Sequence, residues 1–388
     1  MKMNLSKIGG AMALLLALSA CRGSDEQLVH SVENQLQNPA SEAMKGRSDF
    51  QKGFYLLNEG NMGMNKCTLD YMDFVTGCYH KNIYAETNPD MVLELGDVGN
   101  DIQVYGDKLY AVINCSHYVE VMDRHTAKHL GSIKVSNCRN LAFHNGYAYV
   151  SSYSGPVQID PNARPGMVAK VDTASLAVVA ECVVGYQPEE MAVVGNRLYV
   201  ANSGGYRAPH YDNTVSVIDL DSFTEVKKIE VGINLHRMVA DRGGHLYVSS
   251  RGDYYTVPSN LYVLDTHTDQ VTDTLDVAVS EMCLDEEMLY LLSTEYSYLD
   301  PKEWDISYTL IDTRTNQVVS HAFITDGTDK LIEKPYGLAI HPVTKEIFVT
   351  DAKDYVSPGR LYCFHPDGTK KWEVTTGDIP AHLVFVGK

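Results

Sequence analysis

The 388-residue sequence lacks an apolar run long enough to cross a bilayer as a helix. The run near its N-terminus, residues 11–17 (AMALLLA), is much shorter than the roughly 20 residues that a spanning helix needs. Positive charge is also scarce, because 32 lysines and arginines face 50 aspartates and glutamates, for a formal net charge of −18. A surface this acidic repels phosphates, so no nucleic acid is expected as a partner.

The chain also lacks the short motifs of common enzyme classes. It contains no HExxH, no GxSxG and no nucleotide-binding glycine loop in a suitable context. Hardly any helix is expected, so no histidine pair has the helical spacing of a metal site. The sequence therefore predicts a protein that is not an enzyme, with no catalytic residue, no catalytic cofactor and no metal.

The N-terminus has the features of an export signal. Lys2 and Lys7 precede the apolar run, which is followed by the residues LSAC. Small residues directly before a cysteine resemble the bacterial lipobox. This resemblance implies a signal peptide over residues 1–20 and lipidation of Cys21. An ordinary secretory signal with a chance cysteine is the alternative.

A polar stretch separates this signal from the rest of the chain. Residues 21–50 show no strand pattern and are interpreted as the lipidated cysteine and a flexible tether, with the folded domain over residues 51–388. The first tether residues, RGSDEQ, resemble signals that send lipoproteins of Bacteroides-type bacteria to the outer face of the outer membrane. The expected location is therefore the outer membrane, lipid-anchored and facing the cell exterior. The anchor is the expected membrane contact.

Seven cysteines follow Cys21, and an odd number in an exported protein cannot all form pairs. Cys283 and Cys363 lie in apolar strand patterns and are expected to be buried free thiols. Cys115 and Cys138 are candidates to face each other across neighbouring repeats.

A short motif recurs along the chain at a period near fifty residues. It consists of a small turn followed by an aliphatic–aromatic–aliphatic triplet. The aromatic positions are Tyr55, Tyr110, Tyr149, Tyr199, Tyr247, Tyr290 and Phe348. Seven copies at this spacing indicate an internal repeat that organises the whole domain.

A second motif has the same period, an apolar alternation that runs into an Asp-led turn. It reads YMDFVTG, EVMDRHT, AKVDTAS, SVIDLDS, YVLDTHT and TLIDTRT, with the variant CFHPDGT. Asp and Thr or Ser in tight turns bond to their own backbone and support a hairpin between two strands. Each repeat therefore contains four antiparallel strands, which at this period is a propeller blade.

The last strand of the chain belongs to the first repeat. Residues 379–386 (IPAHLVFV) resemble the strands that open other repeats, such as 187–194 (QPEEMAVV) and 334–340 (KPYGLAI). The first repeat conversely starts at residue 53 with its second strand. We therefore predict an all-β seven-bladed β-propeller with four-stranded blades, closed by the C-terminal strand in blade one. An open solenoid or a β-sandwich array does not explain this final strand.

Two sets of segments meet on one face of such a ring: the starts of the opening strands and the loops between second and third strands. The loops are rich in tyrosine and contain Trp304, one of only two tryptophans. Exposed aromatics around a concave centre suit a large amphipathic ligand. The predicted ligand-binding residues are Arg139, Tyr153, Glu189, Tyr206, Arg207, His210, Tyr211, Arg237, Arg251, Asp253, Tyr254, Tyr255, Tyr296, Tyr298, Trp304, Tyr336 and Tyr355. The alternatives are a channel of satisfied polar side chains, and rings that pack loop against loop.

Residues 196–232 (NRLYVANSGGY…NTVSVIDLDSFTEVKKIEVG) resemble the YncE-like propellers, and the repeat covers residues 53–388. Together with LNEGNMGMN at 57–65 and the lipobox, the chain resembles Bacteroides propeller lipoproteins, and its aromatic rim resembles the BtuG cobalamin-binding surface lipoproteins. The resemblance implies that the protein captures cobalamin (vitamin B12) or related corrinoids outside the cell and delivers them to an outer-membrane TonB-dependent transporter.

Two other functions stay open from the residues alone. Glu189, Glu281, Asn140 and Asp101 are candidates to converge on a cation, as in propeller lactonases, which would make the protein a metal-dependent hydrolase. The aromatic rim also suits a scaffold that binds protein or glycan.

Overall fold

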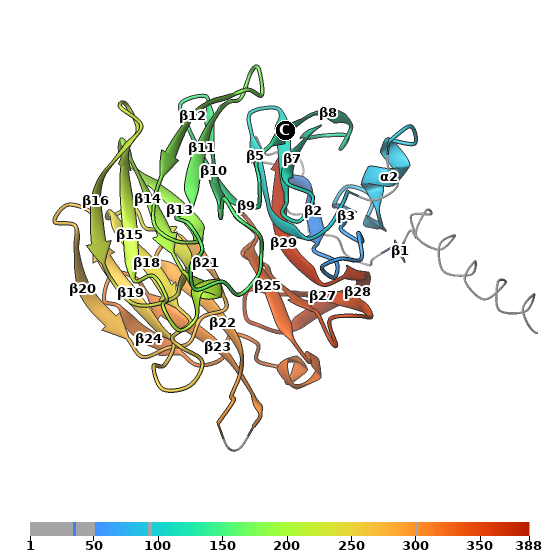
Figure 1. Cartoon of the computed structure of the whole chain (residues 1–388). Helices are drawn as coiled ribbons and strands as arrows, with labels where there is room; N and C mark the ends of the chain where they lie inside the picture. The colour runs from blue at the N-terminus through green and yellow to red at the C-terminus, as the bar shows by residue number, and fades with distance from the viewer. Residues whose placement is uncertain (1–33, 36–50, 92–94, 300–301, 388) are drawn as a thin grey trace, which may run out of the picture.

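The computed structural model describes residues 34–35, 51–91, 95–299 and 302–387. These residues form seven antiparallel sheets around a common axis (Figure 1). The chain is therefore an all-β seven-bladed propeller, as the repeat predicted. The predicted signal peptide and Cys21 lie outside the described residues. Within the described ranges, no helix is long and apolar enough to cross a membrane.

Blades two to seven each contain four strands in chain order. Blade two consists of β5 (Gly99–Tyr105), β6 (Lys108–Ile113), β7 (Tyr118–Asp123) and β8 (His129–Lys134). Blade three consists of β9 (Cys138–His144), β10 (Tyr147–Ser152), β11 (Met167–Asp172) and β12 (Val178–Val183). Blade four consists of β13 (Pro188–Val194), β14 (Arg197–Asn202), β15 (Thr214–Asp219) and β16 (Thr224–Glu230). Blade five consists of β17 (Leu235–Ala240), β18 (His245–Ser250), β19 (Asn260–Asp265) and β20 (Gln270–Leu275). Blade six consists of β21 (Glu281–Asp285), β22 (Met288–Tyr296), β23 (Trp304–Asp312) and β24 (Gln317–Ser320). Blade seven consists of β25 (Pro335–Ile340), β26 (Ile347–Asp351), β27 (Pro358–Phe364) and β28 (Lys370–Asp378).

Blade one is completed by the C-terminal strand. β29 (Pro380–Gly387) pairs antiparallel with β2 (Gln51–Asn58), with Phe54 opposite Phe385. β3 (Thr68–Asp73) and β4 (Cys78–His80) continue the same sheet. In Figure 1 the red end of the chain lies beside its blue beginning. The predicted closure is confirmed, and it removes the unpaired edge that an open ring would present.

Blade one differs from the prediction at its outer edge. β1 (Asn34–Gln35), from the segment interpreted as a tether, pairs with β4 and adds a fifth strand. This pairing could not be predicted, because two residues are too few to carry a periodic pattern. Among the described residues, the structure also contains short helical segments that were not predicted: α2 (Ile83–Thr87), η2 (Gly205–Arg207) and η3 (Thr328–Leu331).

The aromatic residue of each repeat packs between neighbouring blades. Tyr110, for example, lies in one apolar cluster with Val121 of its own blade and Leu141 of blade three. The hydroxyl of Tyr247 donates a hydrogen bond of 3.1 Å to the carbonyl of Thr313 in the next blade. Removing such a buried ring typically costs about 3–5 kcal/mol. The repeat motif is thus a packing motif that joins the blades into one ring.

The Asp-led turns join the third and fourth strands on one face of the disc. In blade two, Asp123 Oδ1 accepts hydrogen bonds of 3.0 Å from the backbone N–H groups of both His125 and Thr126. Equivalent bonds form at Asp73, Asp172, Asp219, Asp265, Asp312 and Asp367. The loops between second and third strands therefore lie on the opposite face, which we call the upper face.

Every cysteine in the described ranges is a free thiol. Cys138 is buried and its sulfur donates to the carbonyl of Tyr118 at 3.3 Å, so the expected pairing with Cys115 does not occur. Cys363 is buried as expected, whereas Cys283 is half-buried.

Candidate functional site

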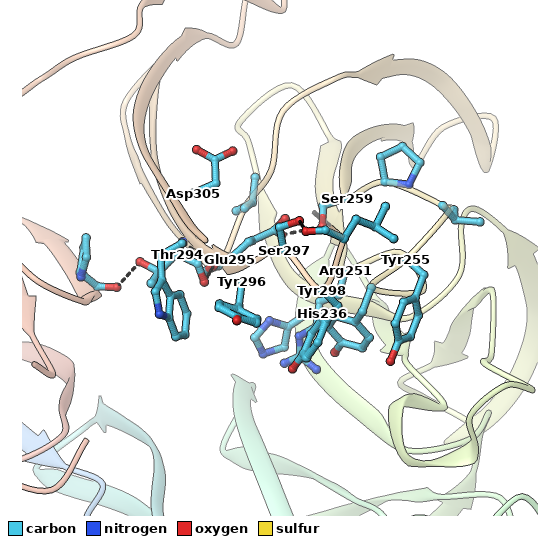
Figure 2. Close-up of a pocket in the computed structure, with 18 of the residues that line it drawn as sticks. His236, Arg251, Tyr255, Ser259, Thr294, Glu295, Tyr296, Ser297, Tyr298 and Asp305 are labelled. Atoms are coloured by element: carbon cyan, nitrogen blue, oxygen red, sulfur yellow. Dashed lines mark hydrogen bonds between the residues drawn. The ribbon is translucent and has the colours of Figure 1, made fainter. Parts of the chain in front are cut away.

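The larger cavity of the upper face is lined by blades five, six and seven and has a volume of about 530 Å³ (Figure 2). We call it the aromatic cavity. Its lining includes Arg237, Arg251, Tyr254, Tyr255, Val257, Pro258, Glu295, Tyr296, Tyr298, Leu299, Trp304, Tyr336 and Tyr355. The lining combines seven tyrosine or tryptophan rings with charged and hydroxyl side chains. A concave surface in which aromatic rings and placed polar groups converge is suited to a small molecule.

The rings of this cavity form a continuous chain of contacts. Tyr255 and Tyr298 have ring centroids 5.7 Å apart, and Tyr298 and Tyr296 are 5.1 Å apart. The chain continues from Tyr296 to Trp304, from Trp304 to Tyr355 and from Tyr355 to Tyr336. Tyr255 is nevertheless 59% exposed and Tyr298 is 50% exposed. The rings therefore pack loop against loop, as one of the alternatives expected, while part of their surface stays exposed. Their contact with a ligand stays a prediction.

The length of the β22–β23 hairpin places the aromatic rings of blade six on the upper face. β22 and β23 are nine residues each, and their hairpin pairs Tyr296 with Trp304 at its end. In most other blades the second strand has six residues or fewer. The longer hairpin lifts its aromatic residues beyond the rim of the disc, into the space next to blades five and seven.

The loop of blade five is held by its own aspartate. Asp253 Oδ1 accepts hydrogen bonds from the backbone N–H groups of Tyr255, Thr256 and Val257, at 2.7–2.9 Å. These bonds, led by the one from Val257, lower the pKa of Asp253. The carboxylate of Asp253 thus orders the loop that carries Tyr254 and Tyr255. The predicted contact of Asp253 with the ligand stays a prediction.

A second, smaller cavity of about 150 Å³ adjoins the aromatic cavity. We call it the polar funnel, because charged side chains from the opening strands dominate its lining. Those side chains include Glu59, Arg139, Glu189, His236, Arg237, Arg251, Tyr336 and His382. His236, Arg237, Arg251 and Tyr336 line both cavities, so the two form one connected site.

Most charges of the polar funnel are paired. Arg139 Nε and Nη2 both lie 3.1 Å from Glu189 Oε2, and the hydroxyl of Tyr153 donates to Glu189 Oε1 at 2.5 Å. Arg237 lies 3.2 Å from Glu190 and 2.7 Å from Glu281. The paired guanidinium groups hold these carboxylates in place, as expected for charges removed from water.

Burial and the charge of nearby arginines shift the pKa values of the funnel glutamates in opposite directions. Burial raises the pKa of Glu189, but Arg139 and Arg251 outweigh it and lower this pKa overall. Burial raises the pKa of Glu190 to about 7, opposed by Arg237 and helped by the nearby Glu281. Glu189 is therefore a fixed negative charge, whereas Glu190 takes up a proton near neutral pH.

Positively charged side chains act on His236. Burial lowers its pKa well below the usual value, and the charges of Arg251, Arg237, Arg139 and His382 lower it further. Its imidazole is therefore neutral at physiological pH. The neutral ring stands at the boundary between the two cavities (Figure 2).

The structure brings most of the predicted site residues together. The aromatic cavity contains Arg237, Arg251, Tyr254, Tyr255, Tyr296, Tyr298, Trp304, Tyr336 and Tyr355. The polar funnel adds Arg139 and Glu189. The residues outside both linings are Tyr153, Tyr206, Arg207, His210, Tyr211 and Asp253.

The predicted residues of blades three and four mostly support other groups. Tyr153 is only 2% exposed, and its ring lies under the guanidinium of Arg139 at 4.8 Å. Arg207 stacks on Tyr186 at 3.6 Å and donates to the carbonyl of His210 at 2.9 Å. These side chains shape the loops. Direct contact of Tyr206, Arg207, His210 and Tyr211 with a ligand stays a prediction.

Several lining residues were not predicted. Glu295 accepts a hydrogen bond of 2.5 Å from Ser259 across two blades, and Thr294 donates to the carbonyl of Pro335 at 2.6 Å (Figure 2). Glu59 accepts from the hydroxyl of Tyr336 at 2.9 Å. These pairs join residues far apart in sequence, so no local motif could have revealed them.

The carboxylates proposed for a cation site have other partners. Glu189 pairs with Arg139 and Glu281 pairs with Arg237. Asp101 Oδ2 accepts from the N–H of Leu141 at 2.8 Å. Among the residues that the structure describes, no three His, Cys, Asp or Glu side chains come together as a possible metal site.

Comparison with protein families gives one match over most of the folded chain. Residues 52–379 match the family described as a domain of unknown function, DUF5074. The chain belongs to the DUF5074 family. A comparison with curated proteins gave no match.

The DUF5074 chain is similar in fold to several solved structures. Hydrazine synthase of Kuenenia stuttgartiensis matches at 16% identity with a TM-score of 0.58, over 73% of this chain and 88% of that one. A quinonprotein alcohol dehydrogenase-like protein from Bacteroides thetaiotaomicron matches at 14% identity and 0.58, over 87% and 79%. The computationally designed Ika8 protein matches at 11% identity and 0.53, over 87% and 92%. At these identities the likeness shows the propeller fold alone.

Proposed function

We propose that this propeller is a surface lipoprotein that captures cobalamin or related corrinoids and delivers them to an outer-membrane TonB-dependent transporter. It has no catalytic role of its own. The observation that carries the proposal is the aromatic cavity, a chain of touching rings with exposed faces beside a polar funnel. A corrinoid combines a broad planar ring that has apolar faces with a fringe of amides.

The chemistry of the two cavities suits such a ligand. Tyrosine and tryptophan rings provide large contact areas with few rotatable bonds, and their polar tips pair with amides. The hydrogen bonds of Asp253 and the ring-to-ring contacts order the site before a ligand arrives. Pre-ordering favours affinity because less conformational freedom is lost on binding.

Delivery to a transporter requires a second surface. The candidates for this contact are exposed apolar side chains on other loops of the upper face, namely Met62, Met64, Ile159 and Val356. Solvent-exposed apolar groups of this kind often mark protein contacts. Cys21 and the acidic tether, which resemble a lipoprotein signal, would hold the propeller at the membrane surface through the lipid anchor.

Titration calorimetry of the purified protein with cyanocobalamin tests this function. The expected result is saturable binding with one site per chain and a shift in the visible spectrum of the corrinoid. An absence of heat and of spectral change at micromolar protein would reject it. Lactone turnover that depends on calcium would instead support the hydrolase.

A further inference from the structure

Three arginines line the polar funnel, and one of them makes no side-chain hydrogen bond to another described residue. Arg139 donates to Glu189 and Asn100, and Arg237 is bracketed by Glu190 and Glu281. The nearest carboxylate oxygen to Arg251 is Glu189 Oε1, at 3.8 Å from Nη1. Glu189 already accepts hydrogen bonds from Arg139 and Tyr153, and at 3.8 Å it is too far from Arg251 for a hydrogen bond. The N–H donors of the Arg251 side chain are therefore available to another acceptor.

The position of Arg251 gives these donors access to a ligand. Its side chain is 27% exposed, and it lines both the aromatic cavity and the polar funnel. Figure 2 draws Arg251 among the residues that line the aromatic cavity. A guanidinium carries five N–H donors in a planar fork that matches a phosphate or carboxylate.

Charged groups of both signs lie around Arg251. Arg251 is the strongest of the cations that lower the pKa of His236, after burial. Of the carboxyl groups in the aromatic cavity, Glu295 accepts its hydrogen bond from Ser259. Burial raises the pKa of Glu295, and the Ser259 hydrogen bond and the charge of Arg251 partly oppose this rise. Asp305 is drawn apart from Arg251 in Figure 2. In the described ranges, Glu189 is the one carboxylate within 4.0 Å of Arg251.

We propose that Arg251 binds an anionic phosphate or carboxylate of the ligand while the adjacent tyrosine rings cover its planar body. The inference rests on the proposed function and narrows it: the ligand carries a negative group at one edge. For a corrinoid that group is the phosphodiester of the nucleotide loop. Cobinamide, which lacks this loop, is bound without the contact.

The test compares Arg251→Gln with the native protein in titrations of cyanocobalamin and dicyanocobinamide. A charge-assisted, bidentate contact predicts a loss of about tenfold or more in cyanocobalamin affinity. Dicyanocobinamide affinity is expected to stay unchanged. Arg251→Lys keeps the charge without the fork and is expected to lose less. Arg242→Gln, on the opposite face of the same blade, is the matched control and is expected to lose nothing.

Equal losses for both corrinoids, or no loss for either, would overturn the role of Arg251 and leave corrinoid capture intact. If neither corrinoid binds the native protein, corrinoid capture fails, and phenyl phosphate then decides the role of Arg251. Binding of phenyl phosphate that Arg251→Gln weakens and Arg242→Gln does not would support an anion subsite. Equal binding by both variants, or none by the native protein, would overturn it.

Discussion

Replacing Tyr255 by alanine tests whether the exposed rings of the aromatic cavity bind the ligand. Tyr255 is 59% exposed, so much of its ring is available for contact. A tyrosine buries about 150–250 Å² when covered, so roughly 100 Å² is available here. If a flat ligand covers one ring face, about half of that area is buried. At about 25 cal/mol per Å² this contributes ~1 kcal/mol.

The expected result for Tyr255→Ala is therefore a roughly fivefold weaker affinity for cyanocobalamin, measured by calorimetry. Tyr255→Phe is the matched control, because it keeps the ring and removes the hydroxyl, and it is expected to lose less. The ring centroids of Tyr298 and Tyr255 lie 5.7 Å apart. The losses of affinity from the two alanine substitutions are therefore expected to be non-additive in the double variant. Unchanged affinity in the double variant would refute the reasoning that these rings bind the ligand.

Three other perturbations follow from the contacts described. Asp253→Ala removes the bonds that order the loop of Tyr255 and is expected to weaken ligand binding several-fold with little change in melting temperature. Glu190→Gln is expected to gain stability relative to the native protein as pH rises from about 5 to 8, by on the order of 2 kcal/mol in urea unfolding. The sign follows from the pKa of Glu190, which is about 7 in the folded protein and lower in the unfolded chain. The native protein therefore has the full stability contribution of protonated Glu190 at pH values below the unfolded pKa and loses it as pH rises through 7. Glutamine does not titrate, so its stability is not lost in this way. Deletion of residues 380–388 opens the ring and is expected to abolish the cooperative thermal transition seen by circular dichroism.

Two of these perturbations have a matched control, and each has a result that would contradict it. Asp253→Asn keeps one acceptor and is expected to fall between the native protein and alanine, whereas full affinity in Asp253→Ala would contradict the loop argument. Glu181→Gln, on an exposed outer strand, is expected to show no dependence of its effect on pH. A stability difference for Glu190→Gln that is flat between pH 5 and 8 would contradict the raised pKa. A truncated chain with an unchanged melting temperature would contradict the closure.

The fold was predictable because its signals are local and repeated. The aromatic of each triplet recurs on the second strand of every blade, from Tyr55 to Phe348, and the Asp-led turns mark every outer hairpin. The closing strand was predictable because its sequence resembles the other opening strands. In contrast, the pairing of Asn34–Gln35 with blade one depends on a tertiary contact of two residues without a pattern.

The candidate site was predictable as a surface and less so as a set of contacts. Loop tyrosines indicate an aromatic rim, but sequence alone does not tell which rings face the ligand. Tyr153 is buried, and its hydroxyl donates a hydrogen bond to the buried carboxylate of Glu189 on the neighbouring blade. Glu295 and Ser259 meet because the long hairpin of blade six reaches across to blade five. Such contacts between side chains depend on strand lengths and blade spacing, which no local motif encodes.

A structure of the purified protein with cyanocobalamin bound tests the central claim most directly. The account predicts the corrin lying against the rings from Tyr255 to Tyr336, over the aromatic cavity, with its phosphodiester beside Arg251. A ligand seated on the opposite face of the disc, or away from blades five to seven, would contradict it.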